Sequence, residues 1–115
     1  MAKDKELDIN IVRNGACSVV HVEGDIDLKS SPDLRAAIID LYEKRGQHRV
    51  ILDLAGVPYI DSSGVAILVE GLQEAKKRHA RFILCALNEA PRHVLELTRL
   101  TKVFEITRTV EEALK

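Results

Sequence analysis

The sequence predicts a single α/β domain, in which helices pack against a mostly parallel sheet with an antiparallel N-terminal hairpin at its edge. The chain has 115 residues, a length that suits one compact domain. Strand-like and helix-like segments alternate in the order ββαβαβαβα, which is typical of parallel strands joined by right-handed helical crossovers. No internal repeat or low-complexity segment indicates a second domain, so we expect residues 1–115 to form one unit.

The first two predicted strands form the hairpin. Residues 7–13 alternate apolar and polar side chains, as a half-exposed strand does. Asn14-Gly15 follows, and both residue types tolerate the positive φ angles of a two-residue hairpin turn. Residues 16–22 contain three valines and are predicted to return antiparallel to the first strand.

A loop over residues 24–27 separates the hairpin from the first predicted helix. Residues 30–33 (Ser-Ser-Pro-Asp) begin that helix, because they offer a hydroxyl cap, a proline in the first turn and an acid near the positive end of the helix dipole. Apolar side chains recur at helical spacing to about residue 45, and Gly46 ends the helix. Residues 50–54 are a short, mostly apolar run, typical of a central strand buried on both faces.

The second half of the chain continues the alternation. A second helix is predicted over residues 62–78, a buried strand over 81–87, and a third helix that opens at 88–91. An edge strand over 102–106 follows, and Thr109 to Glu112 match a capping box for a short C-terminal helix. The side chains expected on the inner face of the second helix are those of Val65, Leu68, Val69 and Leu72.

Composition limits the classes of function. The formal net charge is −1, so no global field attracts nucleic acid or an anionic membrane. No apolar run approaches the roughly 20 residues of a membrane helix, and the charged start lacks the apolar core of a secretion signal. The two cysteines, Cys17 and Cys85, form no CxxC pair, and the four histidines are scattered. We expect a cytoplasmic protein with reduced thiols, without a cofactor, a metal site, membrane insertion or direct nucleic-acid binding.

The run Asp61-Ser62-Ser63-Gly64 is the strongest candidate for a site. It falls at the start of the second predicted helix, where unpaired amides and the positive dipole end favour phosphate groups. Two interpretations stay open on these residues: plain capping by Asp61 or Ser62, or a functional serine. The run does not match the nucleophile elbow of hydrolases, because Ile60 stands where that motif needs its first glycine. We therefore predict that the protein is not an enzyme.

Three segments carry a resemblance to a known family. Residues 59–68 (Tyr-Ile-Asp-Ser-Ser-Gly-Val-Ala-Ile-Leu) resemble the phosphorylation-site signature of the STAS domain family, and most of all its anti-sigma factor antagonists. Residues 24–27 (Gly-Asp-Ile-Asp) match the Gly-Glu-Leu-Asp turn of that family, with Asp for Glu and Ile for Leu, and residues 50–54 match its central strand. The resemblance covers nearly the whole chain and implies a STAS-like fold. One departure is Val65-Ala66, where several relatives have Leu-Gly, and it leaves the subfamily open.

The resemblance also implies a mechanism, called partner switching. Ser62 would be phosphorylated by a partner that is both an anti-sigma factor and a serine kinase, with Ser63 as the second choice, and a serine phosphatase would reset it. Unmodified protein would bind the anti-sigma factor and release its target, and so regulate transcription or another process. The partner-binding residues that the resemblance implies are Asp25, Asp27, Asp61, Ser63, Gly64 and Val65.

Two other classes of function compete with this one. The first is a STAS subunit of a transport assembly, in which the same surface docks on a membrane complex and no phosphorylation occurs. The second is a small enzyme such as an esterase, which the failed elbow motif disfavours.

Overall fold

The computed structural model of the protein describes residues 6–115 and confirms the predicted order ββαβαβαβα. The elements, in chain order, are β1 (Asp8–Asn14), β2 (Cys17–Glu23), α1 (Ser31–Glu43), β3 (Arg49–Gly56), α2 (Ser62–Lys77), β4 (Arg81–Cys85), α3 (Glu89–Leu97), β5 (Glu105–Thr107) and α4 (Val110–Leu114). None of the helices in residues 6–115 is both long and apolar enough to cross a membrane.

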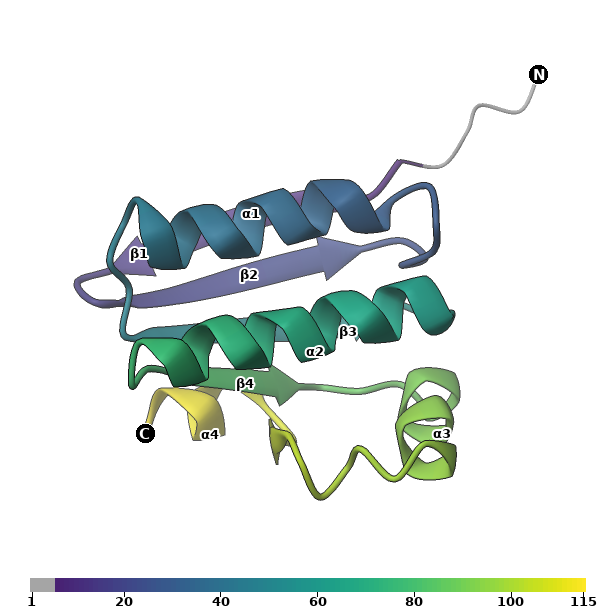
Figure 1. Ribbon diagram of the computed structural model, residues 1–115. Helices are drawn as coiled ribbons and strands as arrows, with labels where there is room; N and C mark the ends of the chain where they lie inside the picture. Colours follow the sequence, from purple (N-terminus) through teal and green to yellow (C-terminus); the bar gives the residue numbers. More distant parts are fainter. Residues whose placement is uncertain (1–5) are drawn as a thin grey trace.

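The strands form one sheet in the order β1-β2-β3-β4-β5. β1 and β2 pair antiparallel, and Gly15 takes the positive φ of +63° that the tight turn between them requires. The other three pairs are parallel, so β1 is the antiparallel edge that the sequence predicts. The carboxyl ends of β2, β3 and β4 consequently meet at one end of the sheet, where α1, α2 and α3 begin (Figure 1).

Helices cover both faces of the sheet, as continuous apolar strands require. α1 and α2 lie side by side across one face (Figure 1). The strand residues under them are fully buried and include Val20, Val22, Val50, Leu52, Leu54, Phe82 and Leu84. On the opposite face the short α4 packs through Ala113 against Ile51 and Ile83. β3 is therefore buried from both sides, as its sequence predicts.

The four predicted residues of α2 do pack on the core, but of these only Leu68 is fully buried. The buried residues of the helix are Gly64, Ile67, Leu68, Gly71 and Ala75, whereas Val65, Val69 and Leu72 are only half-buried. The reason is that small residues let the helix approach the sheet: a Cβ on Gly71 would lie 2.7 Å from Cζ of Phe82. The apolar side chains beside this small-residue stripe then pack at its margins.

The start of α1 is also built differently from the prediction. Ser30 occupies the N-cap position, but its side chain makes no capping hydrogen bond and its backbone is helical. The hydroxyl instead donates to the carbonyl of Asp25 at 2.8 Å and accepts from the amide of Asp27 at 3.0 Å. Its bonding capacity is thus used to fold the preceding loop.

Two strands have other boundaries than the predicted ones. β4 ends at Cys85 and not at residue 87, and β5 lies at 105–107 and not at 102–106.

Candidate functional site

The two loops that carry the predicted site residues are joined by backbone hydrogen bonds. These are the β2–α1 loop (residues 24–30) and the β3–α2 loop (residues 57–61). The amide of Ile26 donates to the carbonyl of Tyr59 at 3.0 Å, and the amide of Asp61 donates to the carbonyl of Ile26 at 3.1 Å. Ile26 and Ile60 form a parallel bridge at the same point. Asp25 and Asp27 therefore lie beside the start of α2, as the sequence-based hypothesis requires.

Asp61 is the residue that caps α2. Its backbone is extended, and its Oδ1 accepts a hydrogen bond from the amide of Gly64 at 3.1 Å. This settles which side chain caps: it is Asp61 and not Ser62. Ser62 is exposed at the first position of the helix, and within residues 6–115 its hydroxyl has no hydrogen-bond partner. Ser63, one position further on, is half-buried.

Gly64 is part of the packing beneath the site and is not on its surface. A Cβ built on Gly64 would lie 2.5 Å from Cγ1 of Ile60, 2.8 Å from Cγ2 of Ile26 and 2.8 Å from the carbonyl oxygen of Ile26. Real Cβ atoms essentially never come that close to other heavy atoms. Only glycine therefore lets the first turn of α2 sit directly on the bridge between the loops. Val65, also expected at the partner surface, is half-buried and packs on the core.

The carboxylate of Asp27 shapes its own loop. Its Oδ1 accepts from the amides of Ser30 at 3.0 Å and Lys29 at 3.1 Å. The bond from the Ser30 amide is the main reason why the pKa of the Asp27 carboxyl lies below its ordinary value. Asp27 is therefore ionised and held in place. Asp25 is half-buried and contributes its carbonyl to the same loop.

Two exposed apolar side chains lie in these loops, and neither is among the site residues predicted from the sequence. Leu28 in the β2–α1 loop is 75% exposed, and Tyr59 in the β3–α2 loop is 49% exposed. Leu28 directly follows Asp27 in the sequence, and Tyr59 stands two residues before Asp61. Exposed apolar side chains close to acidic residues are typical of protein interfaces. We call Leu28 and Tyr59, together with the exposed parts of the two loops and Ser62, the loop surface. Residue type alone does not single them out, because the same loops also contain Ile26, Val57 and Ile60, which are buried.

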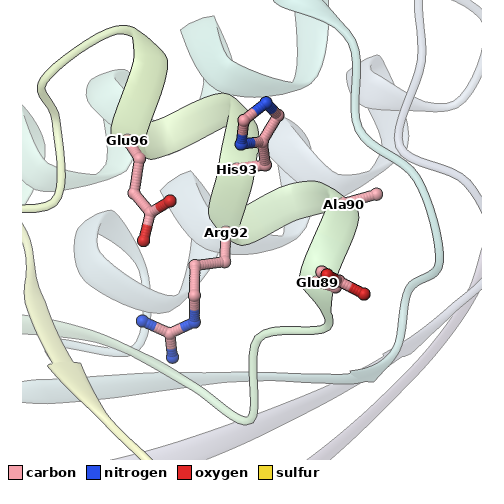
Figure 2. Close-up of a pocket in the computed structure, with 5 residues that line it drawn as sticks. All are labelled: Glu89, Ala90, Arg92, His93 and Glu96. Atoms are coloured by element: carbon pink, nitrogen blue, oxygen red, sulfur yellow. The ribbon is translucent and has the colours of Figure 1, made fainter.

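A surface pocket of about 550 Å³ lies on α3 and not at Ser62. It is lined by Glu89, Ala90, Arg92, His93 and Glu96, all from one helix. Figure 2 shows these side chains spread along the helix without converging on a common point. Such an arrangement does not form the convergent set of polar groups that marks a small-molecule site.

A histidine–aspartate pair lies on the face of the sheet opposite α1 and α2. Nδ1 of His21 and Oδ2 of Asp53 are 2.6 Å apart, and the other oxygen of Asp53 accepts from the amide of Ala55. Cys85 is the neighbour of Asp53 on β4, and burial raises the pKa of its thiol to about 12. That thiol therefore stays protonated at neutral pH. Among residues 6–115, no group of three or more His, Cys, Asp or Glu could hold a metal ion.

Known proteins share both the sequence pattern and the fold. A family model described as "STAS domain" matches residues 8–113. The anti-sigma-B factor antagonist of Bacillus subtilis is 27% identical over 105 residues, which are 91% of this chain and 94% of that protein. The crystal structure of an anti-sigma factor antagonist from Mycobacterium paratuberculosis gives a TM-score of 0.86 at 27% identity, covering 99% of this chain and 96% of that one.

A further solved structure is similar in fold. The Bacillus cell fate determinant SpoIIAA in its phosphorylated form gives a TM-score of 0.74 at 21% identity, covering 93% of this chain and 96% of that one. The similarity to these proteins extends over nearly the whole chain and includes the two loops of the loop surface.

Proposed function

Since the chain belongs to the STAS domain family, whose model matches residues 8–113, we propose that it is an anti-sigma factor antagonist switched by phosphorylation of Ser62. Unmodified protein binds an anti-sigma factor that is also a serine kinase, and so releases the target of that factor. The kinase then phosphorylates Ser62 with ATP, which separates the partners, and a serine phosphatase resets the cycle. The protein acts by binding rather than by catalysis, and it works in the cytoplasm, where the kinase finds ATP.

One observation carries the choice of Ser62. Its hydroxyl is exposed and has no hydrogen-bond partner within residues 6–115, because Asp61 already supplies the cap of α2. A kinase therefore need not break a structural contact to reach it. Ser63 is half-buried one position further into the helix, which makes it the second choice. Asp61 already binds the amide of Gly64, but the amides of Ser62 and Ser63 at the helix start have no intrahelical partner, so a phosphate on Ser62 has donors nearby.

The charge around Ser62 explains how a phosphate would end binding. Phosphorylation adds about −1.5 to −2 charges to a surface that already holds Asp25, Asp27 and Asp61. A helix N-terminus tolerates that charge within the domain, so we do not expect the fold to break. The phosphorylated relative keeps the same fold, which supports this view. A partner seated on Leu28 and Tyr59 instead meets a strongly anionic surface. A penalty of about 3 to 4 kcal/mol would lower its affinity several-hundred-fold.

Phosphosite mapping tests the proposal directly. Purified protein is incubated with a candidate anti-sigma factor kinase from the same organism and ATP, and the modified residue is located by mass spectrometry. We expect one phosphate on Ser62, none in Ser62→Ala, and normal phosphorylation in the matched control Ser63→Ala. Normal stoichiometry in Ser62→Ala would show that the assignment is wrong.

Binding measurements separate the switch from its alternatives. Ser62→Glu should bind the anti-sigma factor at least tenfold more weakly than wild type, although one carboxylate carries less charge than phosphoserine. Tyr59→Ala should also weaken binding of the anti-sigma factor, even though Ser62 in this variant carries no phosphate. Tight binding to a membrane transport complex without phosphorylation by any kinase would instead support the transport-assembly alternative.

A further inference from the structure

The side chain of Asn88 faces away from the helix that it begins. Asn88 occupies the N-cap position of α3, with φ −73° and ψ 169°, and it makes no side-chain capping hydrogen bond. An asparagine at this position ordinarily accepts a bond from the second or third amide of its own helix. Here its Nδ2 lies 2.9 Å from the carbonyl of Val57, 3.0 Å from that of Ala55 and 3.4 Å from that of Leu54. All three partners can only accept, so they fix which end of the amide faces them.

These carbonyls belong to the end of β3 and the start of the loop that leads to Ser62. The other side of this segment is held by backbone bonds, since the carbonyls of Gly56 and Tyr59 accept from the amides of Gly24 and Ile26 at 2.9 and 3.0 Å. Among residues 6–115, Asn88 is the side chain that hydrogen-bonds to the segment from the α3 side. The segment is therefore clamped between a backbone ladder and one side-chain amide.

We propose that Asn88 is a positioning residue, which holds the β3–α2 loop in the conformation that presents Ser62 to its kinase. This proposal rests on the proposed function and deepens it. Backbone carbonyls that lose a protein partner form hydrogen bonds with water instead. A loop whose carbonyls bind water can adopt additional conformations. The first turn of α2 follows that loop directly, so the position of Ser62 depends on the order of the loop. The clamp also joins this loop to the start of α3.

The variant that separates positioning from stability is Asn88→Asp. Aspartate is as good an N-cap residue as asparagine, so the start of α3 can gain the side-chain cap that Asn88 does not supply. It has nearly the same shape but no amide donors, so its carboxylate oxygens would face three carbonyl oxygens. We expect kcat/KM for phosphorylation of Ser62 to fall about tenfold, the equivalent of about 1.4 kcal/mol, with a small change in melting temperature. Asn88→Ser, which caps but cannot reach the loop, should behave in the same way.

Hydrogen exchange supplies a readout that needs no kinase. The amides of Val57 and Asp61 should exchange faster in Asn88→Asp than in wild type, while amides in the middle of β3 stay protected. The matched control is Glu89→Gln on the adjacent exposed residue, which should leave both exchange and phosphorylation as in wild type. Equal phosphorylation of Asn88→Asp and wild type, with equal loop exchange, would overturn the positioning role.

Two further outcomes would also decide the matter. Phosphorylation rates that fall only in proportion to the lost stability across Asn88→Ala, Asn88→Ser and Asn88→Asp would mean that the residue is merely structural. A wild-type protein that accepts no phosphate on Ser62 would remove the proposed function, and this proposal would fall with it. If wild type is phosphorylated and Asn88→Asp is phosphorylated equally well, the positioning role alone fails.

Discussion

Replacing Gly64 with alanine sets two physical effects of opposite sign against each other. Glycine inside a helix costs about 1 kcal/mol relative to alanine, so helix propensity alone predicts that Gly64→Ala stabilises the protein. The contacts predict the reverse, because a Cβ would lie 2.5 Å from Cγ1 of Ile60 and 2.8 Å from both Cγ2 and the carbonyl oxygen of Ile26. The sign of the measured change therefore reports which effect wins.

The nature of the third contact decides the expected sign. Isoleucine side chains can rotate away at a modest cost. The Ile26 carbonyl cannot, because it belongs to the backbone bridge between the two loops and accepts a hydrogen bond from the amide of Asp61. Moving it would disturb that hydrogen bond. Overpacking of a well-packed site costs about 1 to 3 kcal/mol, and all three contacts here are closer than real Cβ atoms allow, which favours the upper part of that range. After the gain in propensity, we expect a net destabilisation of about 1 to 2 kcal/mol.

Urea unfolding followed by circular dichroism measures this change. We expect a lower midpoint at an unchanged slope, because the surface exposed on unfolding stays the same. The matched control is Ala66→Gly, an exposed position in the same helix, which should lose about 1 kcal/mol through propensity alone. If Gly64→Ala were more stable than wild type, the close packing of α2 on the loop bridge would be refuted, and with it the account of how Ser62 is placed.

Two other predictions concern the cap of α2 and the buried thiol of Cys85. Asp61→Ala should lose about 1 kcal/mol with the cap, which lowers the melting temperature by about 4 °C for 115 residues, whereas Asp61→Asn keeps an acceptor and should melt near wild type. Equal losses in the two variants would mean that charge rather than capping matters. Burial raises the pKa of Cys85 to about 12. In Cys17→Ser protein, where Cys85 is the remaining cysteine, we therefore expect reaction with a thiol reagent at pH 8 only after unfolding. Cys85→Ser protein should react faster, because its remaining thiol is that of half-buried Cys17. Rapid reaction of folded Cys17→Ser protein would contradict this assignment.

Much of the fold could be predicted because it is encoded in local patterns. Asn14-Gly15 marks the hairpin turn, and the run at 50–54 marks a strand buried on two faces, and both are confirmed. The buried face of α2 was harder to predict, because hydrophobicity points to the large side chains. The helix packs through Ile67 and Leu68 and also through Gly64 and Gly71, whose importance depends on the residues opposite them.

The candidate site also contains some features that local sequence patterns predict and others that depend on residues far apart in the sequence. The helix start at Asp61 is a local signal, and the structure confirms where α2 begins. Leu28 and Tyr59 were missed because no local pattern predicts that they stay exposed, and their two loops come together only where Ile26 and Ile60 pair. Asn88 was assigned to a helix start, which is correct. The sequence does not reveal that its side chain serves another loop, because its partners are backbone carbonyls about thirty residues away, which leave no trace in residue type.

The division of roles between adjacent residues determines what a phosphate could change. If Ser62 were the cap of α2, phosphorylation would alter the helix start and the fold would respond. The cap is instead the carboxylate of Asp61, and the amide of Gly64 is already bound. Under the proposed function, a phosphate on Ser62 would therefore displace no capping bond and would add its charge to the exposed start of α2. The geometry thus favours a modification that acts on a bound partner, and a fold that is nearly the same in both states.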